Sequence, residues 1–208
     1  MFAPGAGRPL AVVAGVLVLV AALVALGVVP DRTAAVAALV VVGAVWLFLA
    51  VFFRDPERSP GPGVVSAADG RVRAVEREGD RWRISVFMNV TDVHVNRLPL
   101  DARVETVADA GSGYRPAYRS DAHHNVQRAY RLVTALGPVE VVQMTGVLAR
   151  RLVSFVRSGA EGRKGDRFGM IVLGSRVDVL LPAATAVPSV KVGDRVRAGS
   201  STIAEELP

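Results

Sequence analysis

Two uncharged apolar blocks near the start of the chain constrain its fold more than any other feature. They cover Leu10–Val29 and Ala34–Phe53, and only Pro30-Asp31-Arg32-Thr33 separates them. As an α-helix, each block spans about 30 Å, the thickness of the bilayer hydrocarbon. A secretory signal peptide has a shorter apolar core and is not followed at once by a second such block. The sequence therefore predicts a two-helix transmembrane hairpin over residues 1–53.

The arginines around these blocks predict the orientation of the hairpin. Arg8 precedes the first block, and Arg54 and Arg58 follow the second, whereas Arg32 in the connecting loop is offset by Asp31. Because positively charged flanks stay on the cytoplasmic side, both ends of the hairpin are expected there. We thus expect a protein of the cell membrane whose main domain lies in the cytoplasm. The absence of cysteine is compatible with that compartment.

The charge of the chain favours a lipid partner over nucleic acid. The formal net charge is +6, but the basic residues are scattered among acidic ones, and only 6% of residues are aromatic. Base stacking needs aromatic side chains in a basic groove, so nucleic acid is not expected. A basic domain held at a cytoplasmic leaflet faces anionic lipid headgroups. Three histidines without a recognisable ligand spacing predict no metal site. A homo-oligomer is compatible with these features.

Beyond a linker over residues 54–65, the pattern of residues 66–208 is mainly that of β-strands. Alternation of apolar and polar residues predicts strands over 71–78, 81–88, 101–108, 139–146 and 169–174. Only Gly146–Val156 has a helix-like spacing, and a strand is possible there too. The short, evenly spaced strands predict a compact β-barrel or sandwich.

An internal repeat sharpens this prediction. The stretches "VRSGAEGRKG" (156–165) and "VKVGDRVRAG" (190–199) share valine, a basic residue and glycines at equal spacing, thirty-four positions apart. Glycines at such positions indicate sharp turns between short strands. These turns resemble those of the lipoyl and biotinyl carrier domains, which have a barrel-sandwich hybrid fold. The Met-Lys pair of those carriers is absent here, so the resemblance implies the fold and not the carrier function.

The stretch "RFGMIVLGSRVDVLLP" (167–182) has an unusual interruption. Gly174-Ser175 divides a run of β-branched and aliphatic residues, although glycine packs no side chain in a strand and costs backbone entropy. Taken alone, the pair indicates a bulge or a tight bend.

Three further stretches give the pair another meaning. In order and spacing, the four stretches resemble the phosphatidylserine decarboxylases, in the short membrane-anchored form of prokaryotes, from about residue 50 to the C-terminus. The stretches are "FFRDPERSPG" (52–61), "SAADGRV" (66–72), "FMNVTDVHVNRLPLDARV" (87–104) and "GRKGDRFGMIVLGSRVDVLLP" (162–182).

The resemblance implies a proenzyme that cuts itself between Gly174 and Ser175. The serine hydroxyl attacks the preceding carbonyl, an N→O shift gives an ester, and β-elimination opens the chain. Ser175 then becomes an N-terminal pyruvoyl cofactor on a small chain of residues 175–208. A serine hydroxyl needs a base to act as a nucleophile. By the logic of an Asp-His-Ser triad, the resemblance assigns the base to His94 and its orientation to Asp69.

Each of these side chains also has an ordinary structural interpretation. Alternation places Asp92, His94 and Asn96 on one polar strand face, where a histidine is usually exposed, and Asp69 in "ADG" is typical of a turn. Many longer family members carry a second histidine three residues after the first, and this chain has Arg97 there. His94 therefore either performs both self-cleavage and protonation of the product, or shares these tasks with another group.

Three charged residues are weaker candidates for substrate binding. Arg97 takes the place of the second histidine, and Arg176 and Asp178 follow the predicted cut. The last two either position the headgroup or form a structural ion pair. His123 and His124 have an exposed loop pair as their simplest interpretation.

The function implied by the resemblance is the decarboxylation of phosphatidylserine to phosphatidylethanolamine, with the phospholipid as the partner in the membrane. An archaetidylserine decarboxylase with the same mechanism is one alternative. The other is a non-catalytic membrane adaptor with a barrel-sandwich domain. An adaptor explains the hairpin and the repeat but leaves "FFRDP", "VHVNR" and "FGMIVLGSR" without a role.

Overall fold

The computed structural model describes residues 1–28, 31–114, 124–146, 151–172 and 175–208, with the side chain of Ser175 excepted. Gly174 and His123 lie outside the described residues. The chain forms two compact units, Met1–Pro56 and Glu57–Pro208.

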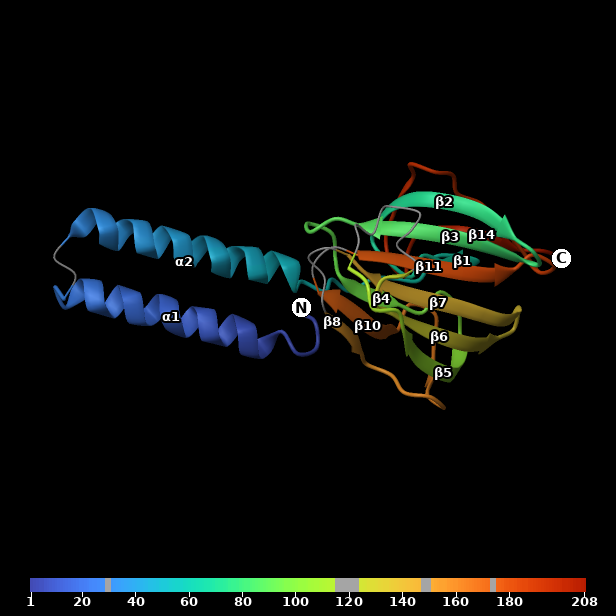
Figure 1. The fold of residues 1–208 in the computed structure, drawn as a ribbon, viewed down its shortest axis with the longest axis horizontal. Helices are drawn as coiled ribbons and strands as arrows, with labels where there is room; N and C mark the ends of the chain where they lie inside the picture. Colours follow the sequence, from blue (N-terminus) through green and yellow to red (C-terminus); the bar gives the residue numbers. More distant parts are fainter. Residues whose placement is uncertain (29–30, 115–123, 147–150, 173–174) are drawn as a thin grey trace. The chain divides into compact units, whose positions relative to one another are not determined.

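The first unit consists of the two apolar helices that the sequence predicts (Figure 1). Helix α1 covers Gly7–Ala25, and α2 covers Arg32–Phe52. Asp31 caps α2, because its carboxylate accepts hydrogen bonds from the backbone N–H groups of Thr33 and Ala34. Both helices are long and apolar enough to cross a membrane, and little of either is buried. The core helix of a soluble protein would have its apolar side chains covered, so these helices are not of that kind.

The second unit is built from β-strands that form three antiparallel sheets in the described residues. The strands of the largest sheet, in spatial order, are β13 (Arg195–Val196), β2 (Gly70–Glu78), β3 (Arg81–Met88), β11 (Ser175–Pro182), β7 (Gly137–Thr145), β6 (Gln127–Thr134), β5 (Ala102–Ala110) and β9 (Glu161–Gly162). The second sheet has the order β4 (Val95–Arg97), β10 (Arg167–Val172) and β8 (Arg151–Ser154). The third has the order β1 (Val64–Val65), β14 (Thr202–Glu206) and β12 (Ala186–Pro188).

Strand β11 occupies the middle of the largest sheet, between β3 and β7 (Figure 1). Val177, Val179 and Leu181 alternate along it and are fully buried in the hydrophobic core. The β-branched and aliphatic character of this strand therefore reflects its central position. The mainly β architecture that the sequence predicts is confirmed.

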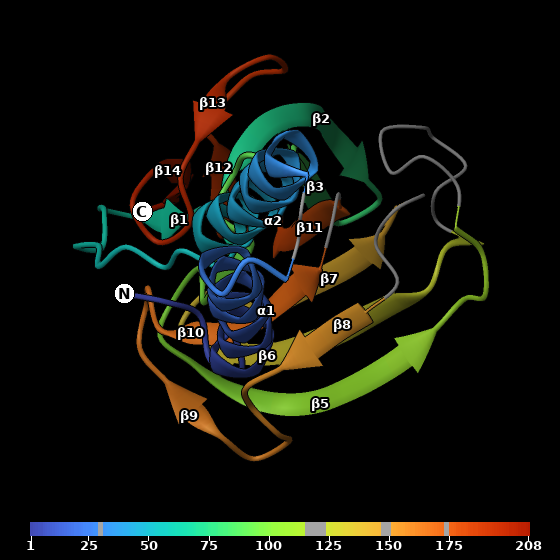
Figure 2. The same ribbon diagram turned by 90° about the vertical axis from the view of Figure 1, so that its left-hand side faces the viewer.

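The sheet of β4, β10 and β8 packs on the largest sheet, with β8 and β10 alongside β6 and β7 (Figures 1 and 2). The rings of Tyr130 on β6 and Phe168 on β10 meet edge to face, with 4.8 Å between their centroids. Gly169 allows this close approach, because a Cβ there would lie 2.8 Å from the side-chain nitrogen of Gln143 on β7. The two sheets thus enclose a tightly packed core.

The repeat forms two equivalent pairs of turns. Gly159 and Gly165 have φ angles of +86° and +88°, and Gly193 and Gly199, thirty-four positions later, have +98° and +74°. These angles favour glycine, which confirms that the repeat marks sharp turns. In both copies the short strand between the glycines, β9 or β13, pairs with a longer strand at one edge of the largest sheet.

One sequence pattern gave a misleading indication. The helix-like spacing over residues 146–156 suggested a helix, but Arg151–Ser154 is strand β8, which pairs with β10. The strand β8 covers four residues, too few for a two-residue period to show against the leucine spacing. By contrast, the strands expected at 71–78 and 81–88 coincide with β2 and β3 to within one residue.

Candidate active site

The predicted cleavage point lies at the start of the central strand. Ser175 is the first residue of β11, and in the backbone register it lies between Met88 of β3 and Thr145 of β7. Met88 is fully buried. It provides a fixed reference from which the other predicted stretches can be placed.

The stretch that carries Asp69 borders β3 from the opposite side. Gly70 has a φ angle of +146°, and a Cβ on it would clash with the carbonyl of Phe87, next to Met88. No other residue type would allow this approach of the backbone to β3. Asp69-Gly70 and Ser175 are therefore about two strand spacings apart, roughly 10 Å, with Met88 between them.

His94 is buried, which excludes its interpretation as an exposed strand residue. It directly precedes β4, and none of its surface is accessible to solvent. Its carbonyl accepts a hydrogen bond of 3.3 Å from the backbone N–H of Ile171, near the end of β10. Because β10 ends at Val172, three residues before Ser175, His94 and the start of β11 lie at the same end of the domain.

The ring of His94 has a defined orientation. Its Nδ1 lies 2.9 Å from the carbonyl oxygen of Asp92. A carbonyl oxygen only accepts, so Nδ1 carries the proton and donates it in this hydrogen bond. In the neutral ring the basic nitrogen is then Nε2, the atom that a general base requires.

Alternation along the sequence places Asp92 on the same face as His94, and the structure adds its role. Its carboxylate accepts hydrogen bonds from the backbone N–H of Asn89, at 2.9 Å, and from Arg195, at 3.1 Å. These contacts fix the turn before β4, and the carbonyl of Asp92 in turn holds the His94 ring. Its signal in the sequence is its position two residues before the histidine.

Asp69 links two of the stretches that resemble the family, residues 52–61 and 66–72. Its carboxylate forms a two-point ion pair with Arg58 and accepts the backbone N–H of Ala198 at 2.8 Å. Arg58 also donates to the carbonyl of Ala198, at 2.8 Å. Both side chains are largely buried. The partners that the structure gives to this carboxylate are thus Arg58 and Ala198, and an orienting contact from Asp69 to His94 stays a prediction.

A chain of buried polar side chains connects the two sheets beneath the site. The Tyr130 hydroxyl donates to Gln143 at 3.1 Å, the Gln143 amide donates to Asn96 at 2.7 Å, and Asn96 donates to the sulfur of Met88 at 3.7 Å. Burial raises the pKa of Tyr130, so its hydroxyl stays a donor. A fully satisfied buried network of this kind rigidifies a core. This network fixes β4, which directly follows His94, relative to Met88, the neighbour of Ser175 on β3.

Arg176 and Asp178 form an ion pair, as one of the two interpretations of these residues predicts. Two hydrogen bonds of 2.6 Å join them, and Asp178 is fully buried. Arg83 adds a hydrogen bond of 2.7 Å to Asp178 and binds Glu78 at 2.5 Å. The hydrogen bond from Arg83 lowers the pKa of the Glu78 carboxyl, so Glu78 stays charged at neutral pH.

Arg97 is engaged by a turn of the repeat. It is almost fully buried, and its guanidinium donates to the carbonyl of Gly165 at 3.0 Å. Its aliphatic stem lies against Gly199, where a Cβ would come within 2.8 Å of it. These contacts describe a residue that holds the two repeat turns together.

Comparison with known proteins shows the family of the chain. The family model of phosphatidylserine decarboxylase matches residues 45–204. The chain belongs to the phosphatidylserine decarboxylase family. It is 44% identical over 157 residues to a phosphatidylserine decarboxylase proenzyme of Thermobifida fusca, covering 74% of this chain and 72% of that protein. It is 45% identical over 161 residues to a putative archaetidylserine decarboxylase proenzyme of Halobacterium salinarum, covering 76% and 80%.

Other relatives extend the same result. A phosphatidylserine decarboxylase proenzyme of Streptomyces avermitilis is 41% identical over 154 residues, covering 73% of this chain and 71% of that protein. The members of this family are enzymes, which excludes the alternative of a non-catalytic membrane adaptor. The word proenzyme in the names of the relatives fits a chain that is processed after synthesis.

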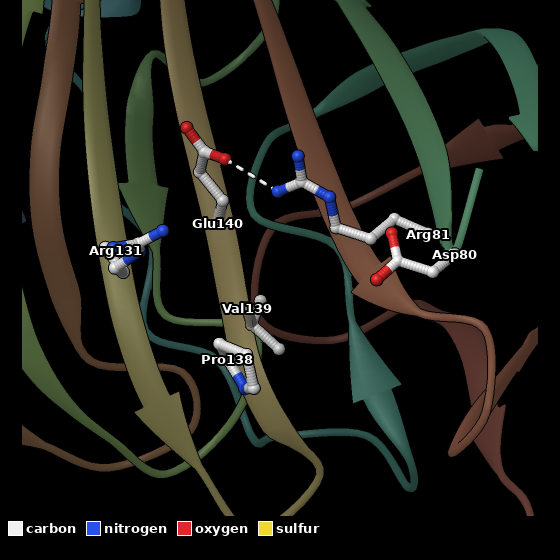
Figure 3. A pocket seen from close by; sticks show the side chains of 6 residues that line it. All are labelled: Asp80, Arg81, Arg131, Pro138, Val139 and Glu140. Carbon is white, nitrogen blue, oxygen red and sulfur yellow. Dashed lines mark hydrogen bonds and ion pairs between the residues drawn. The ribbon is translucent and has the colours of Figure 1, made fainter. Parts of the chain in front are cut away.

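A pocket on the largest sheet lies away from the candidate site of this decarboxylase (Figure 3). Its volume is about 260 Å³, and its lining residues are Asp80, Arg81, Arg131, Pro138, Val139 and Glu140. Arg81 and Glu140 form an ion pair across it, at 3.0 Å. Arg81 pairs with Pro182, at the end of β11 opposite to Ser175. At about 3.3 Å per residue, this pocket is roughly 20 Å from the predicted cut.

Proposed function

We propose that this chain is a membrane-anchored proenzyme that cuts itself at Gly174–Ser175 and then decarboxylates phosphatidylserine to phosphatidylethanolamine. One observation carries the proposal beyond family membership. Ser175 begins the central strand β11 at the end of the domain where the stretch with Asp69 approaches β3 and the stretch with His94 approaches β10. The hydroxyl of Ser175 would attack the carbonyl carbon of Gly174, and its proton would pass to Nε2 of His94. The tautomer set by Asp92 supports this direction of proton transfer.

The position of the cut explains how the two products stay together. Strand β11 pairs with β3 along all of its residues, from Ser175 to Pro182, and with β7 from Ser175 to Leu180. The same small chain contributes β14, which pairs with β1 and β12. We therefore infer that residues 175–208 remain an integral part of the domain after cleavage.

The residues around Ser175 fit a pyruvoyl group at this position. Cleavage there leaves the new N-terminus at the end of a strand that is held on both sides, so the group would have a fixed position. The pyruvoyl ketone supplies an electron sink for the electrons left by the departing CO₂. His94, buried and held by Asp92, would then return a proton to the α-carbon of the product.

The two apolar helices support a substrate that stays in the bilayer. Both are long enough to span the hydrocarbon, and an anchored domain meets lipid headgroups without extracting them. We place the domain on the cytoplasmic side, because Arg8, Arg54 and Arg58 flank the helices there.

A second candidate substrate is archaetidylserine, the ether-linked analogue. The relative from Halobacterium salinarum that carries this name is 45% identical to the chain, against 44% for the one from Thermobifida fusca. The two lipids share the serine headgroup and differ in the linkage of their chains. Parallel assays with ester and ether phosphatidylserine analogues of equal chain length would rank them.

The test uses the purified full chain in lipid nanodiscs. Intact-mass analysis should show two chains, residues 1–174 and residues 175–208, the second with a blocked N-terminus. Lipid mass spectrometry should show conversion of phosphatidylserine to phosphatidylethanolamine. Ser175→Ala should fold and insert in the membrane, but remain one chain and be inactive. A single uncut chain that decarboxylates the lipid would overturn the pyruvoyl mechanism.

A further inference from the structure

A second pocket, of about 320 Å³, lies at the end of the domain where β11 begins. It opens between the end of β5, the start of β6 and the start of β8. Its lining residues are Asp109, Ala110, Gly111, Val126, Arg128, Arg151 and Leu152.

Both walls of this pocket are hydrogen-bonded to residues that neighbour Ser175 in the sheet or precede it closely in the sequence. On one wall, the carbonyl of Val126 accepts the backbone N–H of Thr145 at 3.0 Å and its hydroxyl at 2.9 Å, and Thr145 is the register neighbour of Ser175. On the other wall, Arg151 pairs with Val172, the last residue of β10. Val126 is thus two strand spacings from Ser175 in the sheet, roughly 10 Å.

One arginine of the pocket is already neutralised. Arg128 forms two hydrogen bonds with Asp109, at 2.5 and 2.7 Å, and donates to the carbonyl of Leu152 at 3.4 Å. The hydrogen bond from Arg128 lowers the pKa of Asp109, which keeps that carboxylate ionised. Arg128 therefore joins β6 to β8 and gives the pocket a charge-balanced floor.

The second arginine supplies a net positive charge. Arg151 is exposed, and no ion pair joins it to another of the described residues. With Arg128 and Asp109 in balance, one positive charge remains among the described lining residues, beside the apolar side chains of Val126 and Leu152. Such a combination suits a singly charged anion that is attached to an apolar chain.

We propose that Arg151 binds the phosphodiester of the phospholipid headgroup and so directs its serine amine to residue 175. This inference rests on the proposed function. In a serine phospholipid the phosphorus is only a few bonds from the reacting amine, so a phosphate subsite must lie near the cleavage point, at the end of the domain where this pocket opens. A guanidinium binds a phosphodiester through two parallel N–H donors, a geometry that lysine does not reproduce.

The chain offers a matched control for this arginine. Arg131 lies on the same strand as Arg128 but lines the distant pocket of Figure 3, together with Asp80, Arg81 and Glu140. Its own ion pair, with Glu105, is long, at 3.7 Å, and exposed. Arg131→Gln therefore removes the same charge from the surface without touching the proposed subsite.

The experiment measures kcat and KM for Arg151→Gln, Arg151→Lys and Arg131→Gln in mixed micelles, normalised to the cleaved fraction. Loss of a charge-assisted hydrogen bond predicts a KM for Arg151→Gln that is about 10- to 100-fold above wild type. Arg151→Lys should recover part of this loss, and Arg131→Gln should match wild type. If the wild type is cut and active but the KM of Arg151→Gln equals that of wild type, the inference about Arg151 is overturned and the proposed function is not. An uncut and inactive wild type overturns the proposed function instead.

A second measurement does not depend on whether Arg151→Gln is processed. Mature wild-type enzyme is treated with phenylglyoxal, and modification of each arginine is mapped by mass spectrometry. Glycerophosphoethanolamine should protect Arg151 and leave Arg131 reactive, whereas ethanolamine, which lacks the phosphodiester, should protect neither. Equal protection of Arg151 by inorganic phosphate at the same concentration would overturn its assignment to the lipid headgroup, as would protection by ethanolamine.

Discussion

Asp69 and Asp101 bind equivalent positions in the two copies of the internal repeat. Asp69 accepts the backbone N–H of Ala198 at 2.8 Å, and Asp101 accepts that of Lys164 at 2.7 Å. Lys164 and Ala198 are thirty-four positions apart, the period of the repeat. Holding a repeat turn is therefore common to both carboxylates. What distinguishes Asp69 is its burial and its ion pair with Arg58.

This equivalence gives a matched pair of variants. Asp69→Asn and Asp101→Asn both keep an acceptor for the turn, but only Asp69→Asn leaves a largely buried arginine without its counter-charge. We expect Asp69→Asn to lower the free energy of unfolding by about 1.5–3 kcal/mol and to slow self-cleavage. Asp101→Asn, in an exposed turn, should change stability by less than about 0.5 kcal/mol and leave cleavage unchanged.

The measurements are thermal unfolding of the full chain in detergent and a time course of cleavage on denaturing gels. Equal cleavage rates in the two variants would show that Asp69 serves the turn alone. A slower rate only in Asp69→Asn, with a stability close to wild type, would favour direct orientation of His94.

His94 is expected to affect both self-cleavage and turnover. General acid–base groups contribute roughly 10²–10⁴-fold, so His94→Ala should slow the appearance of residues 175–208 by a factor in that range. The fraction that is cut should also turn over slowly if His94 returns the proton to the product. The readouts are the cleavage time course and lipid turnover per pyruvoyl group. Normal values of both would make His94 a purely structural buried residue.

Much of the fold was accessible from the sequence because local signals and tertiary structure agree. The apolar blocks predicted the two helices, and alternation predicted β2 and β3, since each of these strands has one core-facing side. Strand β6 was not singled out, although Tyr130 and Leu132 alternate along it. Arg128 and Arg131 in the same strand make the segment strongly polar. Its pairing with both β5 and β7 identifies it as a strand.

The candidate site was accessible only in part. The resemblance identified Ser175, His94 and Asp69, but a motif carries no information on hydrogen-bond partners. The contact between Arg58 and Asp69 depends on the course of the linker, and the orientation of His94 by a backbone carbonyl leaves no trace in residue type. Both are products of the folded arrangement.

The two products of cleavage should stay associated without a covalent bond. Strand β11 is hydrogen-bonded on both sides, and its core-facing residues Val177, Val179 and Leu181 are fully buried. We expect residues 1–174 and 175–208 to elute together in size-exclusion chromatography in mild detergent and to separate in concentrated guanidinium chloride. Release of the small chain under native conditions would contradict the central position of β11.

Asp178 offers a test of whether the charged network around β11 serves the structure or the substrate. It is fully buried and accepts hydrogen bonds from Arg83 and Arg176. Asp178→Ala leaves both guanidinium groups without this acceptor. Removing one partner of a buried ion pair typically costs about 3–5 kcal/mol. Since Arg83 keeps its contact with Glu78, we expect a loss near the lower end of that range.

The matched control is Glu140→Ala, which breaks the half-exposed ion pair with Arg81 and should cost at most about 1 kcal/mol. Stability is measured by denaturant unfolding of the full chain in micelles, and KM is measured on the folded, cleaved fraction. A structural role predicts that Asp178→Ala is much less stable than Glu140→Ala while the KM of its folded fraction equals that of wild type. A raised KM at wild-type stability would instead return Arg176 and Asp178 to the headgroup site, because a residue that contacts only the substrate leaves the unfolding free energy unchanged.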